Sequence, residues 1–159
     1  MARKFDIEIL LSDLRAIALA NLNTKLASID AEKNDGITLK QLDPDKVFFQ
    51  DLDKSDAAAA PLFLYYGLDD PVTDAIGAHT ALQLSIYFIL VLQDTAENFT
   101  YMTRLLRYMR AMQEIFQENY ATIQYVSRIQ VSSLSPVSFT VEGTGTFKAT
   151  GVKIKAVLA

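Results

Sequence analysis

The feature that most constrains the fold of this chain is an apolar run over residues 81–92, ALQLSIYFILVL. A membrane helix needs ~20 apolar residues, so this run is too short, and it also contains Gln83 and Ser85. Its β-branched and aromatic content favours a strand over the competing interpretation, a buried helix. Alternate residues then form one continuous apolar face: Leu82, Leu84, Ile86, Phe88, Leu90 and Leu92. The opposite face becomes apolar only from Ile89 onward, and there we expect cover on both sides, from helices or from another subunit.

Two other segments have the periodicity of amphipathic helices. Residues 5–29 place apolar side chains at three- and four-residue steps, as in a helix that covers a sheet. The second predicted helix, residues 94–119, begins with Asp94-Thr95-Ala96-Glu97, which fits a capping box. We expect one face of this second helix to be buried, namely Phe99, Met102, Leu106, Met109, Met112 and Phe116.

Shorter segments predict further strands. Residues 61–66, PLFLYY, and a short segment near 47–49 indicate strands, whereas the acidic residues 67–79 indicate a loop. The alternation in 137–141 and 152–158 predicts an antiparallel hairpin with dry and wet faces around a turn at Gly143-Thr144-Gly145, and Ile129 and Val131 indicate another strand. The predicted fold is a single α+β domain over residues 1–159. Its mixed, largely antiparallel sheet packs against an N-terminal helix and a long central helix and ends in a C-terminal β-hairpin.

Composition excludes several function classes. The net charge of −4 over 159 residues argues against a surface that wraps nucleic acid. The chain has no cysteine, which removes disulfides, thiolate metal sites and cysteine nucleophiles. Asp6 and Glu8 interrupt the segment after the basic N-terminus, so we expect no signal peptide. We therefore expect an intracellular chain without a membrane segment.

Possible catalytic and metal sites are weakly supported by the sequence. The segment 30–36, DAEKNDG, has Asp35 where a calcium loop needs glycine, and Gln41 where it needs glutamate, so we expect a solvated turn. His79, the only histidine, follows three aspartates and could act as a base, but no second histidine or nucleophile motif supports it. The Gly143-Thr144-Gly145 segment lacks the later glycine and the lysine of a phosphate loop. We predict no catalytic residue, cofactor or metal.

The candidate interface residues are three arginines at three-residue steps on the second predicted helix: Arg104, Arg107 and Arg110. Such a ridge is either a solvated helix face or a docking site for an acidic surface. Acidic residues are frequent in 43–56 and in the loop that contains Asp69, Asp70 and Asp74. A neighbouring copy of the chain could therefore supply the acidic partner.

Three of these segments, taken in order, carry a family resemblance. Residues 61–66 (PLFLYY), the loop and 82–88 (LQLSIYF), followed by the helix 102–112 (MTRLLRYMRAM), resemble tail-terminator (tail-completion, neck) proteins of long-tailed bacteriophages and related contractile injection systems. The resemblance covers much of the chain as a pattern and includes no catalytic signature. The acidic stretch 43–56 departs from it.

This resemblance implies a structural virion protein of the tail neck, assembled in the host cytoplasm. It would form a ring, usually of six copies, that caps the tail tube, stops its polymerisation and presents a surface to the head connector. The implied partners are further copies of the chain, the tail tube protein, the head–tail connector or stopper and the sheath protein, without sequence-specific DNA binding or membrane binding. The alternatives are another tail-tube or head-completion (connector) subunit, or a small α+β ligand-binding domain or enzyme that uses His79.

Overall fold

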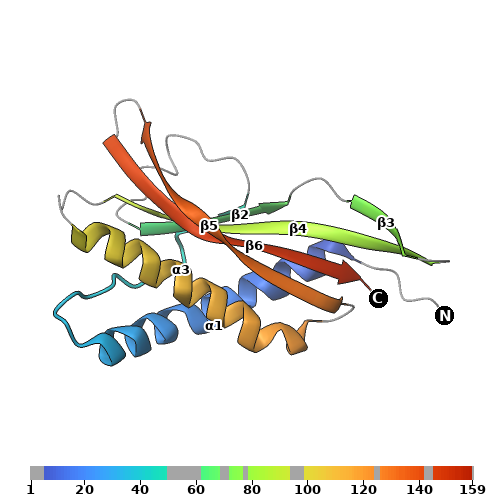
Figure 1. Ribbon diagram of the computed structural model, residues 1–159, viewed down its shortest axis with the longest axis horizontal. Coiled ribbons are helices and arrows are strands. Elements are labelled where there is room, and N and C mark those ends of the chain that lie inside the picture. Colours follow the sequence, from blue (N-terminus) through green and yellow to red (C-terminus); the bar gives the residue numbers. More distant parts are fainter. Residues whose placement is uncertain are drawn as a thin grey trace.

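Two helices, α1 (Ile7–Lys33) and α3 (Phe99–Asn119), lie on the same side of a β-sheet in the computed structural model of the chain (Figure 1). The structure describes residues 6–49, 62–68, 72–76, 79–93, 99–123, 126–141 and 145–158. This arrangement confirms the predicted α+β class, with an N-terminal helix, a central helix and C-terminal strands. The strands are β1 (Val47–Phe49), β2 (Leu62–Leu68), β3 (Val72–Ile76), β4 (His79–Leu92), β5 (Val126–Val141) and β6 (Gly145–Leu158), and a 3₁₀ turn, η1 (Tyr120–Thr122), follows α3.

The sheet has the strand order β1-β2-β4-β6-β5, and β3 pairs with β4 beyond the end of β2. The β1–β2 pair is parallel and the other pairs are antiparallel, which confirms the mixed, largely antiparallel sheet. The prediction of a loop over 67–79 is wrong in part, because residues 72–76 form β3 and pair with the start of β4. The prediction of a separate strand at Ile129 and Val131 is also wrong. Both residues lie in β5, whose register shifts between Leu134 and Val137, on either side of Pro136.

Helix α1 begins and ends with well-defined caps. The Asp6 carboxylate accepts a hydrogen bond of 2.9 Å from the backbone N–H of Glu8, as an N-cap residue does. The predicted end at residue 29 is four residues too early, since the good helix formers Ala31, Glu32 and Lys33 extend the helix. Asn34 then stops it in the left-handed conformation, at φ 44°.

The core lies between the sheet and the helices, and the inner face of β4 runs through its middle. The predicted alternation is confirmed for the residues whose side chains are described, because Leu84, Ile86, Phe88, Leu90 and Leu92 are buried. The ring of Phe88 stacks on Tyr66 of β2, with centroids 5.2 Å apart, and packs against Phe116 of α3 at 4.7 Å. Phe88 therefore joins the sheet to the central helix.

The buried face of α3 differs from the predicted one. Met102 and Leu106 are 50% and 46% exposed, whereas Met112 and Phe116 are buried as predicted. The face that packs on the sheet consists of Tyr101, Leu105, Tyr108, Ala111, Met112, Ile115 and Phe116. The predicted face lies about one residue to the side of the observed one and omitted both tyrosines, Tyr101 and Tyr108. Both tyrosines bury their rings and donate their hydroxyl protons to backbone carbonyls at 3.0 Å, Tyr101 to Leu92 and Tyr108 to Lys40. The capping-box residues 94–97 lie outside the described residues.

The outer face of the sheet, turned away from the helices, is apolar at one end and polar at the other. Val91, Phe147 and Ala149 form a small buried cluster there, with Phe48, Tyr65 and Ile89 packed against it. Further along the same strands, the outer positions are partly exposed polar residues, Gln83, Ser85, Lys153 and Lys155. This end of the outer face is therefore buried in part, but both helices lie on the other side of the sheet, so its cover by another subunit stays a prediction.

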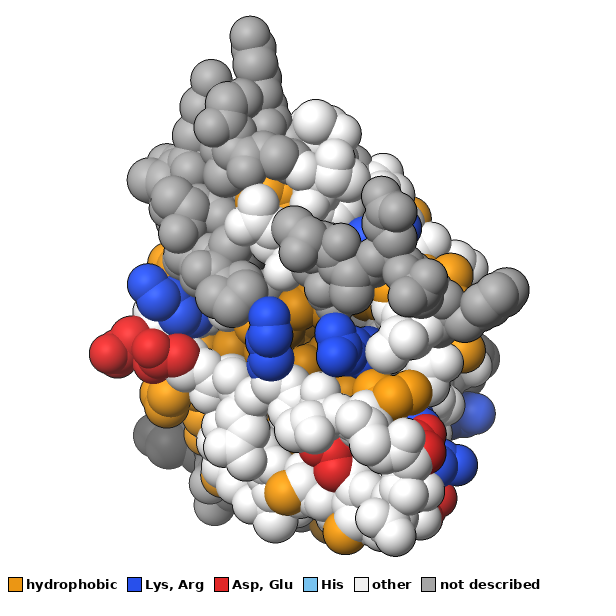
Figure 2. Space-filling view, turned by 90° about the vertical axis from the view of Figure 1, so that its left-hand side faces the viewer, with side chains coloured by type: hydrophobic (Ala, Val, Ile, Leu, Met, Phe, Trp, Pro, Cys, Tyr) orange, Lys and Arg blue, Asp and Glu red, His pale blue; other side chains and the backbone are white. Residues whose placement is uncertain are grey.

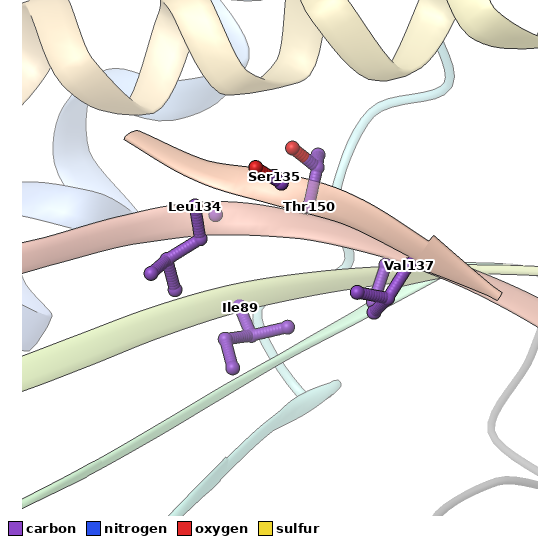
Figure 3. A pocket seen from close by; sticks show the side chains of 7 residues that line it. Ile89, Leu134, Ser135, Val137 and Thr150 are labelled. Atoms are coloured by element: carbon purple, nitrogen blue, oxygen red, sulfur yellow. The ribbon is translucent and has the colours of Figure 1, made fainter. Parts of the chain in front are cut away.

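A hollow of about 260 Å³ opens on the apolar end of the outer face. Ile89, Leu134 and Val137 line it on the side of the sheet turned away from α3, and its floor includes Gly151 (Figure 3). Val137 was predicted on the dry face of the hairpin, but its side chain is 57% exposed. The reason is the register shift in β5, which moves Val137 to the rim of the hollow. The hollow is smaller than the ~300 Å³ at which small-molecule pockets begin.

Candidate subunit interface

The three arginines of the predicted ridge lie on α3, and the ion pairs of Arg107 and Arg110 can be described in detail. The guanidinium of Arg107, only 7% exposed, forms a two-point ion pair with the Asp35 carboxylate, with Nη1 3.1 Å from Oδ1 and Nη2 bound to Oδ2. It also donates to the carbonyl oxygen of Ile37 at 3.4 Å. The hydrogen bond from Arg107 lowers the pKa of Asp35 to about 2. Arg107 therefore holds the segment after α1 against α3.

Arg110 is at the centre of a network between the two helices. Its terminal nitrogens pair with the two Glu32 oxygens at 3.0 and 2.8 Å, and its Nε lies 2.7 Å from Oε1 of Glu114, one turn along α3. Lys25 of α1 extends the network to Glu118 at 2.9 Å. Hydrogen bonds from Arg110 lower the pKa values of Glu32 and Glu114, while Glu32 raises the pKa of Arg110. Two-point arginine–carboxylate pairs of this kind fix orientation as well as adding attraction.

The structure describes only some of the other predicted interface residues. Arg104 is partly exposed on the N-terminal half of α3. Asp74 lies in β3, where its backbone pairs with Ala81. Asp69 and Asp70 lie outside the described residues. The contact between arginine ridge and acidic loop in a neighbouring copy stays a prediction.

Beside these arginines lies an apolar surface that the sequence did not predict. Met102 and Leu106 are one helical turn apart on α3, so their exposed side chains are neighbours. Beside Leu106 is an open hollow of about 310 Å³, lined by Lys33, Thr103, Leu106, Arg107 and Arg110. In the space-filling view, lysine and arginine side chains form a row with apolar surface between them (Figure 2). We call this region of Met102, Leu106 and the hollow the α3 surface.

The described residues give little support to the alternative sites, namely the His79 site and the calcium-like segment 30–36. His79 is the first residue of β4, and its side chain lies outside the described part. In the segment 30–36, Asp35 pairs with Arg107 and one oxygen of Asp30 accepts the backbone N–H of Leu39 at 3.0 Å. Within the described ranges, no group of three or more histidine, cysteine, aspartate or glutamate residues is placed to hold a metal ion. None of the described helices is long and apolar enough to cross a membrane.

Sequence reasoning missed the acidic partners of the arginines. The Arg110–Glu114 pair has the i, i+4 spacing of a helix ion pair and could have been found. Glu32 and Asp35 lie more than seventy residues away from their arginines in the chain. Only the packing of α1 on α3 brings them together.

Comparison with known proteins finds distant similarity among solved structures only. Neither a protein-family model nor a curated protein sequence matches this chain. Among solved structures, the chain is similar to one in "Virion of native gene transfer agent (GTA) particle", with 10% sequence identity over 88% of this chain and 93% of that chain, at a TM-score of 0.38. A similarity at this level assigns neither a family nor a function.

Proposed function

We propose that this chain is a non-enzymatic structural subunit of a phage-like virion, and that it forms the ring that caps a tail tube and joins it to the head connector. The sequence resemblance to tail terminators suggests this role. The observation that carries it is the α3 surface, an exposed apolar pair with a basic hollow beside it. Exposed apolar side chains rimmed by charged ones are typical of protein–protein contact sites.

The α3 surface suits a contact between subunits because its support is rigid. The ion pairs of Arg107 and Arg110 fix α3, the helix that carries the exposed pair Met102 and Leu106, to the end of α1 and the segment after it. Residues already held in place lose less conformational entropy when a partner binds. We include in the proposal the predicted contact of the ridge Arg104, Arg107 and Arg110 with the segment of Asp69, Asp70 and Asp74 in a neighbouring copy, which would orient the subunits more than it would strengthen the ring. Because Arg107 is buried in its pair with Asp35, Arg104 and Arg110 would supply the exposed part of this contact.

The test is negative-stain electron microscopy with mass photometry, on the chain alone and mixed with tail tubes. Rings, or caps at one end of the tubes, are the expected result. The double variant Met102→Ser/Leu106→Ser should remain folded, because both side chains are half exposed, but it should lose rings and caps at concentrations at which the original chain forms them.

Ile9→Ser is the matched control, since Ile9 is an exposed apolar residue on α1, away from the α3 surface. It should assemble like the original chain. Reversing Arg107 is a poor test, because a carboxylate there would face Asp35 and damage the fold. A chain that forms neither rings nor caps would refute the proposal, and normal assembly by the double variant would remove the α3 surface from it.

A further inference from the structure

The last strand of the sheet, β5, is a long edge with little protection. Among the described residues β5 pairs only with β6, and no described strand lies along its other edge. Its sixteen residues contain one charged side chain, Arg128. Native edges are usually blocked by charges, proline or bulges. Pro136 and the register shift block the second half of β5, which leaves residues 129–133 regular and uncharged.

Among the described residues, the opposite end of the sheet is β1. Strand β1 pairs with β2 on one side, and no described strand lies on its other side. Phe49, its last residue, is 49% exposed and contacts Tyr66 edge-on, at 5.2 Å between ring centroids. Phe49 is in register with Tyr66, whose side chain belongs to the helix-facing core, so Phe49 lies on the inner face.

The strand directions make these two edges compatible. Strand β1 is parallel to β2, and three successive antiparallel pairs then lead through β4 and β6 to β5. β5 therefore runs opposite to β1. If a second copy is placed beside the first in the same orientation, its β1 is antiparallel to β5 of the first, which is the more stable kind of pairing.

We propose that copies of this chain associate head to tail, with β1 of one copy adding to the free edge of β5 in the next, so that one sheet continues from subunit to subunit. In this arrangement Phe49 extends the inner apolar face beside Ile129 and Val131, which are half-buried and packed against the core. The two edges are different surfaces, so the contact is heterologous and repeats around an axis. This inference rests on the proposed ring and names the strands that close it.

Cysteine crosslinking tests the pairing, and a chain without native cysteine suits this method. Alternate residues of a strand point to opposite faces, and Ser133, whose hydroxyl bonds to Gln113 of α3, identifies 129, 131 and 133 as inner positions. The variants combine Phe49→Cys with cysteine at 129, 131 or 133, and are oxidised under conditions of assembly. At least one of these three pairs should yield a ladder of covalent dimers, trimers and longer oligomers, since cross-strand neighbours have Cβ atoms ~5 Å apart.

The matched controls place cysteine at 130 or 132, on the outer face, together with Phe49→Cys. These controls should give at least tenfold less ladder. Ser133→Cys is the inner variant least expected to disturb the fold, because the Ser133 side chain is exposed. If cysteine at 129 or 131 destabilises the core, the Ser133→Cys pair still tests the proposal. Thermal unfolding of each variant shows whether it is folded.

The outcomes separate the two proposals. Rings or tube caps without a ladder from any inner pair would overturn the strand pairing and leave the proposed function standing. A ladder without rings or caps would support the strand pairing and overturn the proposed function. Crosslinked dimers from a single cysteine in β5, with none longer, would show symmetric β5–β5 pairing and overturn the head-to-tail arrangement. A chain that stays monomeric alone and with tubes would overturn both proposals.

Discussion

The inner and outer faces of the sheet take alternate residues from the same strands, yet they are buried to different degrees. On β4, the inner residues Leu84, Ile86 and Phe88 are fully buried against the helices, whereas their outer neighbours Ser85 and Tyr87 are partly exposed. The difference shows that the inner face holds the subunit together. The polar end of the outer face stays partly exposed, and the two edges are the parts of the sheet that the proposals assign to contacts with other chains.

The largest expected effect comes from removing an aromatic ring on the inner face. Phe88→Ala should lower the free energy of unfolding by about 3–5 kcal/mol, because the ring packs between Tyr66 and Phe116 and leaves a cavity when it is lost. Tyr87→Ala, one residue away on the outer face, is the control and should cost clearly less. Urea denaturation of both variants measures the difference, and equal losses would contradict the contrast between the two faces.

A smaller effect of the opposite sign is expected at Thr150, which is 2% exposed. Its hydroxyl has no hydrogen-bond partner among the described residues, and an unsatisfied buried polar group destabilises a fold. Thr150→Val should therefore raise the free energy of unfolding by about 1 kcal/mol. The control is Thr146→Val, because Thr146 is an exposed residue of the same strand. Unchanged or lower stability of Thr150→Val would mean that the hydroxyl is satisfied in solution.

The smallest effect concerns the ion pairs that fix α3 to α1, and it depends on pH. The pKa of Asp35 falls from its ordinary value of 3.8 to about 2 through its hydrogen bond with Arg107, so the stabilisation is complete above about pH 4 and is lost as the pH falls to about 2. The lowered pKa values of Glu32 and Glu114 add to this loss on acidification.

Asp35→Asn should make the decrease in unfolding free energy between pH 5 and pH 2 shallower, as measured by urea denaturation at each pH. Asp45→Asn, an exposed carboxylate that pairs with no described arginine, should leave the decrease unchanged. If the unfolding free energy of Asp35→Asn falls as steeply as that of the original chain between pH 5 and pH 2, the Asp35–Arg107 pair does not cause the pH dependence.

The sequence predicted those parts of the fold that follow from local pattern. The alternation in β4 and the periodicity of α1 were sufficient, because each has one apolar face whose burial determines its packing. The face of α3 was predicted only in part, with Met112 and Phe116 buried as expected. Tyr101 and Tyr108 were missed, because they donate to carbonyls outside the helix that no local pattern shows. The sequence likewise predicted Arg107 as an interface residue, which stays a prediction, and did not indicate its partner Asp35, which is far from it in the chain.

Strand β4 also determines how the subunit responds to force. It is fourteen residues long, roughly 46 Å at about 3.3 Å per residue. One edge pairs with β6 without a break from Gln83 to Leu92, and the other edge pairs first with β3 and then with β2. A pull along β4 would load the hydrogen bonds of these ladders together, in shear, rather than opening them one by one. The subunit is therefore stiffest along this strand, and a push on one end is transmitted to the other.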